Sequence, residues 1–297
     1  MPRAPMAPTR RDFGKLALAA VPAISTLRAA PELPSVFHGV RLGIGSYSFR
    51  EFKLDDIIAG LPQVPLGTLE LESRFVEPGM MSAGRGGLPP DQREALRQWR
   101  LGASVDDLRA VKKRFDDAGI HVYAYNIPID ASFTEGEVDR VFPMAQALGV
   151  EAINVVTTLP QAERLVAPAA KYKMRVGFHP TSGRRDENYI GTGDSWRKIV
   201  AMSPNFGVCP DLAGRANWGP DPLAFLREMR DRLTALHTHD TVPFAESQAP
   251  VKDILRVIQN EKMKFVPIIE RIYPLKPEMD KIAEIRGLVE YCKNALA

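Results

Sequence analysis

The chain has 297 residues, of which 45% are hydrophobic and 25% charged, values typical of a globular protein with a sizeable core. Its formal net charge is +3, but residues 1–29 hold five of the 39 basic residues and one of the 36 acidic ones, so the remainder is close to neutral. Without a basic surplus to neutralise a phosphate backbone, the sequence argues against nucleic-acid binding. The two cysteines, Cys209 and Cys292, are too few for a disulfide framework.

Residues 1–30 are predicted to be an export signal. Arg10 and Arg11 precede a short apolar run, Leu16–Val21, and paired arginines in this position resemble a twin-arginine signal. The run is too short to span a bilayer, and no other segment is apolar enough to do so, so we expect no membrane anchor. The sequence therefore predicts cleavage near residue 30 and a periplasmic location, with a disordered basic tail as the alternative.

From residue 40 onward, apolar segments alternate with helical ones. Strands are predicted at Arg41–Phe49, Gly67–Ser73, Ile120–Pro128, Ala152–Thr158, Met174–Pro180, Phe206–Asp211, Leu233–Thr241 and Lys264–Ile272. Helices are predicted at Leu54–Gly60, Ser104–Gly119, Glu137–Leu148, Gln161–Tyr172, Ser195–Met202, Pro222–Arg230, Val251–Glu261 and Pro277–Leu296. Eight such units favour a single α/β domain, a (β/α)8 TIM barrel over residues 31–297. An open doubly wound sheet is the alternative, but no glycine-rich nucleotide motif follows a strand.

Residues 76–103 form an insertion between the second predicted strand and its helix. In a barrel this connection lies at the C-terminal face, where active sites are built. The segment is rich in glycine, proline and methionine, and a short helix is predicted at about Asp91–Arg100. It could act as a lid that brings Arg85, Arg97 or Arg100 to a polar ligand. Equally, the insertion could be a mobile surface segment or a contact between subunits of an oligomer.

Polar residues interrupt four consecutive predicted strands near their C-terminal ends: His179, Asp211, His237 and Glu270. Apolar residues precede each one, and in a barrel the four strand ends are adjacent, so their side chains can converge. Two imidazoles and two carboxylates suit one divalent cation, with Mn²⁺ preferred and Zn²⁺, Co²⁺ or Fe²⁺ as alternatives. His239 shares a strand face with His237, because the two residues are two positions apart.

These motifs resemble those of the xylose-isomerase-like TIM barrel superfamily, the sugar phosphate isomerase/epimerase group. The resemblance covers the chain from residue 40 onward and is carried by GIGSYSFRE, LELES, GFHP, CPDLAGR, HTHD and IIER on strands one, two, five, six, seven and eight. It implies that a metal is held by the residues at the four strand ends, namely His179, Asp211, His237 and Glu270.

Three positions depart from the usual pattern of this group. Many of its epimerases carry glutamate in the place of His179, where it forms a proton-shuttling pair with the glutamate of strand eight. Gly214 and Arg215 stand where the strand-six motif usually continues to a histidine, and His239 stands in the place of a lysine. We therefore expect the metal ligands to be retained while the acid/base residues have changed.

A metal chelated by a sugar carbonyl and its neighbouring hydroxyl would acidify the C–H bond between them and stabilise the enediolate. His239 and Glu270 are the candidate proton-transfer residues, and Tyr47, Arg50 and Arg215 are candidate substrate contacts. The sequence thus predicts a metal-dependent isomerase or epimerase of a sugar or keto-sugar. A lyase or hydratase acting on a keto-sugar or oxidised glycoside shares the first step. A non-catalytic carbohydrate-binding barrel is a third alternative.

The remaining expectations are less specific. The expected partner is a small-molecule carbohydrate, and a homo-oligomer is left open. Glu70 and Glu72 share a face of the second strand and either line the mouth of the barrel or form a solvated or ion-paired feature. The sequence does not decide between these roles.

Overall fold

The computed structural model describes residues 31–80, 88–180, 187–212, 221–239, 251–271 and 279–297. The predicted export signal, residues 1–30, and the middle of the insertion, residues 81–87, lie outside the described residues. Within the described ranges, no helix combines the length and the apolar character needed to cross a bilayer.

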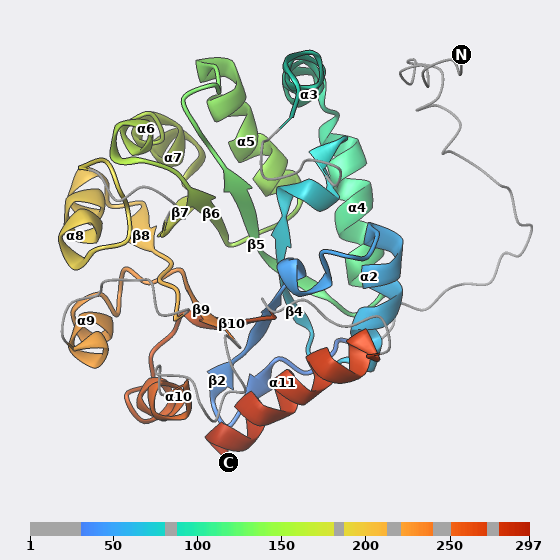
Figure 1. Cartoon of the computed structure of the whole chain (residues 1–297), viewed down its shortest axis with the longest axis vertical. Coiled ribbons are helices and arrows are strands. Elements are labelled where there is room, and N and C mark those ends of the chain that lie inside the picture. The colour runs from blue at the N-terminus through green and yellow to red at the C-terminus, as the bar shows by residue number, and fades with distance from the viewer. Residues whose placement is uncertain (1–30, 81–87, 181–186, 213–220, 240–250, 272–278) are drawn as a thin grey trace, which may run out of the picture.

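Eight parallel strands form a nearly closed barrel (Figure 1). They are β3 (Gly43–Gly45), β4 (Thr68–Glu72), β5 (His121–Pro128), β6 (Ala152–Val156), β7 (Arg175–His179), β8 (Phe206–Val208), β9 (Ala235–His239) and β10 (Val266–Glu270). Hydrogen bonds join them in the order β8-β7-β6-β5-β4-β3-β10-β9. Isolated parallel bridges, Val208 to Leu233 and Asp211 to His237, connect the two ends of this order. The predicted (β/α)8 fold is confirmed.

Helices surround the barrel, as Figure 1 shows. Those described are α2 (Leu54–Gly60), α3 (Pro90–Gly102), α4 (Val105–Asp117), α5 (Glu135–Ala147), α6 (Leu159–Glu163), α7 (Val166–Tyr172), α8 (Gly193–Met202), α9 (Pro222–Glu228), α10 (Val251–Asn260) and α11 (Lys281–Leu296). Helix α3 lies where the sequence predicts a helix within the insertion. A short antiparallel hairpin, β1 (Val36–Phe37) and β2 (Val40–Arg41), precedes the first barrel strand.

Apolar side chains form two clusters. The larger one packs helices against the outside of the barrel and includes Phe115, Phe142 and Trp196. The smaller one consists of Tyr123, Ala124, Cys209, Ala235, Val266 and Ile268. Because side chains of a strand alternate between its two faces, Ile268 shares the inner face of β10 with Glu270. The smaller cluster is therefore an apolar layer inside the barrel, beneath the polar residues at the strand ends.

The first predicted strand, Arg41–Phe49, is shorter than expected. Strand β3 stops after three residues and the chain continues as a 3-10 turn, η2 (Ser46–Phe49). Two serine hydroxyls explain this ending. Ser46 Oγ accepts the backbone N–H of Glu72 at 2.8 Å, and Ser48 Oγ accepts that of Arg271 at 2.9 Å. Side-chain oxygens thus take the place of strand carbonyls for both neighbouring strands.

The single helix predicted over Gln161–Tyr172 is wrong, because the structure has two helices, α6 and α7, separated at Arg164 and Leu165. Pro168 has no N–H to donate to the carbonyl four residues earlier, that of Arg164, so the α-helical ladder is interrupted there. The N–H groups of Arg164 and Leu165 bond three residues back instead, at 3.2 and 3.0 Å.

Four helices that lead directly into barrel strands end in the same way. At the ends of α4, α5, α7 and α10, a backbone N–H donates a hydrogen bond to the carbonyl five residues earlier, at 2.9–3.3 Å. The donors are Ile120, Val150, Met174 and Met263. The residue before each donor is left-handed: Gly119 (φ 73°), Gly149 (φ 71°), Lys173 (φ 51°) and Lys262 (φ 52°). Glycine adopts this conformation freely, whereas for lysine it costs about 1 kcal/mol.

Replacing Lys173 by glycine is expected to stabilise the protein by about 0.5–1 kcal/mol, since relief of the left-handed conformation outweighs the greater freedom of glycine in the unfolded chain. Urea denaturation measures the change. The same substitution at Lys113, in the middle of α4, is expected to destabilise by about 1 kcal/mol. Equal losses at both positions would contradict the interpretation.

Candidate active site

Polar side chains gather at the C-terminal ends of the strands, where (β/α)8 enzymes carry their active sites. They are Glu70 and Glu72 on β4, Asn126 on β5, Asn154 on β6, His179 on β7, Asp211 after β8, His237 on β9 and Glu270 on β10. Glu70 and His237 are buried, at 0% and 1% exposure, whereas the side chains of His179 and Asp211 are each 16% exposed. The more exposed pair marks the end that a substrate can reach.

The structure brings the four predicted metal ligands into one continuous row. His179 Nε2 lies 3.5 Å from Asp211 Oδ2, and His237 Nδ1 lies 3.5 Å from Glu270 Oε2. The two imidazole rings connect these pairs, with ring centroids 4.6 Å apart. The bridge between Asp211 and His237 also joins the two residues through their backbones. Two imidazoles and two carboxylates thus lie side by side at the mouth of the barrel.

The second nitrogen of His237 contacts Glu70, whose role the sequence left open. His237 Nε2 lies 2.8 Å from Glu70 Oε2. The Glu70 carboxylate also accepts a hydrogen bond from Asn154 Nδ2 at 2.5 Å and one from Asn126 Nδ2 at 3.4 Å. A carboxylate that accepts the N–H of one imidazole nitrogen directs the lone pair of the other toward a metal. Here the other nitrogen, Nδ1, is the one that faces Glu270.

The protonation states of this buried group depend on each other. Burial by itself would raise the pKa of Glu70, but the His237 imidazole lowers it below the usual value. Burial disfavours a charged imidazole, yet nearby acidic groups, above all Cys209 and Glu270, raise the pKa of His237 well above its usual range.

His179 is held in a tautomer that suits metal binding. Its Nδ1 lies 2.9 Å from the carbonyl oxygen of Pro180, a geometry that requires the proton on Nδ1. Its Nε2 is buried and makes no hydrogen bond within the part of the chain that the structure describes. A buried nitrogen with a lone pair directed at a carboxylate 3.5 Å away is the arrangement expected of a ligand.

A second set of donors lies deeper in the barrel. One ligand atom each from Glu70, Cys209 and His237 lies within 4.8 Å of the others, close enough to hold a metal. All three residues are almost completely buried, and burial raises the pKa of the Cys209 thiol to about 11. Cys209 has no predicted role, because it precedes Asp211 by two residues and belongs to an apolar strand pattern.

The absence of a side chain at Gly45 leaves the space that the Glu270 side chain occupies. A Cβ atom at Gly45 would lie 2.5 Å from Glu270 Oε1 and 2.7 Å from its Cγ. The glutamate side chain therefore lies directly against the backbone of β3, and any larger residue at position 45 would displace it. The sequence gives glycines at 43 and 45, but only the register between β3 and β10 shows which side chain needs this space.

The predicted substrate contacts Tyr47 and Arg50 lie beside the end of β10. Arg50 Nη1 donates to the carbonyl of Arg271 at 2.8 Å, and its guanidinium carbon lies 4.8 Å from the centre of the Tyr47 ring. Arg74 approaches the same ring at 5.5 Å. These contacts hold the loop after β3 against the residue that follows Glu270.

Several predicted residues fall beyond the described parts of the chain. Arg215 and Arg85 lie outside the described residues, and so does the side chain of His239. The backbone of His239 pairs in register with that of Glu270. Arg97, in contrast, is described and forms an ion pair within its own helix.

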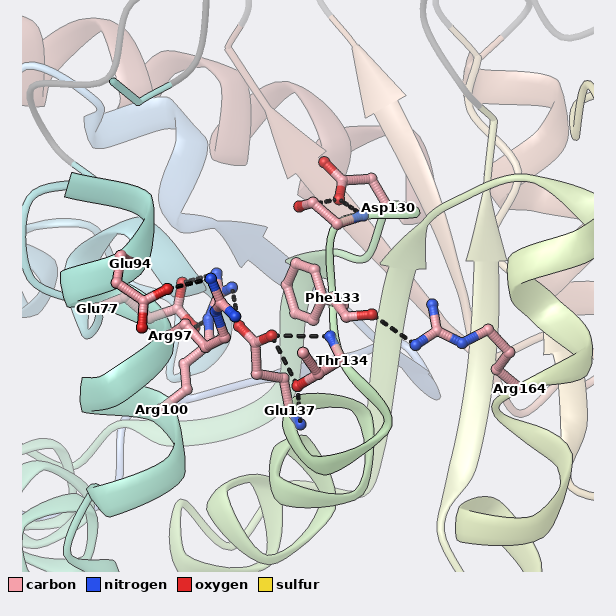
Figure 2. A network of polar contacts seen from close by, with 10 residues as sticks. Glu77, Glu94, Arg97, Arg100, Asp130, Phe133, Thr134, Glu137 and Arg164 are labelled. Atoms are coloured by element: carbon pink, nitrogen blue, oxygen red, sulfur yellow. Dashed lines mark hydrogen bonds and ion pairs between the residues drawn. The ribbon is translucent and has the colours of Figure 1, made fainter. Parts of the chain in front are cut away.

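Arg100 of the insertion belongs to a buried ion-pair network (Figure 2). Its guanidinium donates to both carboxylate oxygens of Glu77 at 2.8 Å and to Glu137 Oε1 at 3.2 Å. Its guanidinium carbon lies 4.1 Å from the centre of the Phe133 ring. Glu137 also accepts the backbone N–H of Thr134 at 2.8 Å at the start of α5. The network fixes α3 to α5, so this part of the insertion is anchored to the barrel.

Glu72 lies two residues beyond Glu70 on the same strand face. Its side chain is 18% exposed, and its Oε2 lies 3.1 Å from Arg74 Nε. Burial raises the pKa of Glu72 to about 7; Arg74 opposes this rise, and the charges of Glu270 and Glu70 add to it. In the folded chain this carboxyl group therefore exchanges its proton near neutral pH.

Because its pKa rises from 4.5 in the unfolded chain to about 7 on folding, ionised Glu72 destabilises the folded state. This effect is absent below pH 4.5, grows as the pH rises to about 7 and is complete above it. Glu72→Gln is therefore expected to raise the Tm of metal-free protein at pH 8 relative to wild type, and much less at pH 4.5. The same substitution at exposed Glu163 is the control. A Tm difference independent of pH would contradict the assignment.

Comparisons with known proteins support the fold. No protein-family model matches the sequence, and no curated protein matches it. Among solved structures, the 3-keto-D-glucoside 4-epimerase YcjR from E. coli matches with a TM-score of 0.62 and 12% identity, over 86% of this chain and 99% of that chain. An L-ribulose 3-epimerase matches with a TM-score of 0.63 and 13% identity, over 86% and 94%.

A third solved structure that matches is named for a different activity. It is the probable 3-DHS dehydratase AsbF from Bacillus anthracis, with a TM-score of 0.59 and 11% identity, over 84% of this chain and 97% of that chain. At identities of 11–13%, these comparisons show that the chain shares the fold of the three proteins over most of its length.

Proposed function

We propose that this chain is a metal-dependent isomerase or epimerase of a sugar or keto-sugar. The observation that supports it most is the row of two imidazoles and two carboxylates at the mouth of the barrel, with separations of 3.5 Å within each pair. Two structures of the same fold are named as sugar epimerases, one of them for a 3-keto-glucoside. The chemistry of the donors and the names of these relatives point to the same class of substrate.

The donor atoms fit a divalent cation of intermediate softness, with Mn²⁺ preferred and Zn²⁺, Co²⁺ or Fe²⁺ as alternatives. His179 Nε2, Asp211, His237 Nδ1 and Glu270 would hold it. When bound, such an ion polarises a carbonyl and stabilises negative charge on the substrate oxygens. The deeper group with Cys209 is less suitable for catalysis, because its members are buried and the carboxylate of Glu70 is already held by two asparagines.

The residues around the ion have separate tasks. Glu70 lies 2.8 Å from His237 Nε2 and favours a proton on that nitrogen, which leaves Nδ1 available to a cation. Glu270 combines ligation with proton transfer at the substrate carbon. His239 remains the predicted second proton-transfer residue, on the expectation that an imidazole exchanges protons near neutral pH. Tyr47, Arg50 and Arg215 remain the proposed substrate contacts.

A lyase or hydratase acting on a keto-sugar or oxidised glycoside is the second candidate. His179 replaces the glutamate that the resemblance leads us to expect on this strand, so Glu270 lacks the usual carboxylate partner. Proton abstraction followed by loss of a group from the neighbouring carbon needs only one such base. The structural relative named as a dehydratase is consistent with this alternative. A non-catalytic carbohydrate-binding barrel is the third candidate.

We further propose that the chain is exported to the periplasm through its twin-arginine motif at Arg10 and Arg11, and that residues 1–30 are removed. Export favours an unphosphorylated sugar as substrate. Fusion of residues 1–30 to a reporter, with and without an Arg10→Lys and Arg11→Lys double substitution, tests this part of the proposal by fractionation.

The metal position is tested by comparing substitutions in the two donor sets. Asp211→Asn is expected to weaken Mn²⁺ or Co²⁺ binding by at least about tenfold, whereas Cys209→Ser leaves it unchanged. Metal content after gel filtration measures binding, and circular dichroism verifies the fold. If Cys209→Ser loses the metal, and the Co²⁺ protein shows a thiolate charge-transfer band, the ion lies in the deeper set.

The reaction is tested with metal-loaded protein and a panel of keto-sugars in D₂O, followed by NMR. Exchange of a C–H proton without loss of water or an aglycone supports the isomerase or epimerase, and loss of either supports the lyase. Silence with bound sugar supports the binding barrel. His239→Ala is expected to retain the metal and slow the exchange, so an unchanged rate would remove His239 from the mechanism.

A further inference from the structure

A cavity of about 270 Å³ lies at the opposite end of the barrel from the candidate active site. Arg175, which begins β7, lines it together with Leu233 and Phe265, which precede β9 and β10. These positions are on the N-terminal face of the strands. The cavity, which we call the basal pocket, is therefore separate from the row of histidines and carboxylates at the mouth.

Four cationic side chains border the basal pocket and come from three separate connections. Arg175 follows α7, Arg230 follows α9, and Lys262 and Lys264 lie between α10 and β10. Asp231 is the single acidic residue in its lining. The pocket thus has a surplus of three positive charges in a chain whose barrel is close to neutral overall.

Among the described residues, the cations at the basal pocket have no acidic partner, unlike several other exposed cations. Exposed Arg197, Arg227 and Lys171 each form an ion pair at 2.6–2.8 Å. Within the described ranges, none of the four cations at the basal pocket forms an ion pair. Their positive charge is therefore available to an anion from outside.

The two arginines are oriented by the backbone. Arg175 Nη2 donates to the carbonyl of Leu233 at 2.9 Å, and Arg230 Nη2 donates to that of Glu261 at 3.1 Å. Each guanidinium keeps further N–H donors beyond this bond. Burial, together with the charge of Arg175, lowers the pKa of neighbouring Arg232, a sign that positive potential accumulates here. Neutral carbonyls hold the arginines in place without cancelling their charge.

Lys262 occupies its place at a conformational cost. It has φ 52° at a helix end where α4 and α5 use glycine, and α7 uses Lys173, in the same hydrogen-bonded turn. Glycine would remove the cost, but it would also remove one of the four charges at the pocket. Lys262 follows the C-terminus of α10, where the negative end of the helix dipole partly stabilises its positive charge. The dipole does not account for the convergence of three other cations on the same cavity.

We propose that the basal pocket binds a small oxyanion, either inorganic phosphate or the phosphate group of a sugar ester. Guanidinium groups donate paired N–H bonds to tetrahedral oxyanions, and ammonium groups add charge without fixed geometry. The apolar floor formed by Leu233, Met263 and Phe265 is buried, so it limits competing water beneath the anion. The bound anion would join α9 and α10 to the start of β7.

The test is titration of the full chain with sodium phosphate against sodium chloride of equal ionic strength, with Tm as the readout and isothermal titration calorimetry for the Kd. We expect a saturable rise in Tm with phosphate alone. In the Lys262→Gly, Lys264→Ala double variant, the Kd is expected to increase at least about tenfold. The Lys173→Gly variant is the matched control: it changes the same turn at a residue that does not line the pocket, and it is expected to retain the wild-type Kd.

A second titration with glucose 6-phosphate distinguishes the two sources of the anion. Tighter binding than phosphate, lost in the double variant, identifies a sugar ester, and equal Kd values identify the free anion. Equal effects of phosphate and chloride would overturn the proposal, and so would a phosphate Kd that the double variant leaves unchanged. Metal content at the mouth is expected to be the same in all variants, so failure here leaves the proposed enzyme function untouched.

Discussion

The contact between His237 and Glu70, at 2.8 Å, determines the arrangement of the candidate active site. It connects β9 to β4 across the interior of the barrel and decides which nitrogen of the imidazole faces Glu270. Asn154 and Asn126 support it by holding the carboxylate from β6 and β5. Because these groups are buried, the loss of any one would leave an unpaired polar atom inside the barrel, at a cost of about 1–3 kcal/mol. The geometry of the candidate site and the stability of the barrel thus depend on the same side chains.

The sequence predicted the barrel and the convergence of two histidines and two carboxylates at its mouth because both follow from local patterns. Apolar strands that end in a polar residue recur with the βα repeat, and parallel strands place those ends together. The role of Glu70 could not be predicted in the same way, since its partner is 167 positions away in the chain and depends on the stagger of strands across the barrel. Cys209 was missed for the same reason, as nothing local distinguishes it from an ordinary apolar residue.

Two local features could not be predicted from the pattern of hydrophobic residues: the end of the first strand and the partner of Arg100. The serines at 46 and 48 end the first strand by accepting hydrogen bonds from the backbones of its neighbours. Arg100 illustrates the converse case, because a charged residue in an insertion at the active-site face suggested ligand binding. The structure places it between Glu77 and Glu137 beneath Phe133, where it fastens the insertion. A charge in a sequence does not reveal whether its partner is a ligand or another part of the chain.

The closure of the barrel has one further consequence. Strands β8 and β9 are joined only by isolated bridges within the described ranges, and one of these bridges links Asp211 to His237. Two of the four proposed ligands therefore stand on either side of the junction that closes the barrel. A ligand that binds both Asp211 and His237 would hold β8 and β9 together, and separation of the two strands would release the ligand. The stability of the closed barrel and the fraction of sites that hold a ligand would then increase or decrease together.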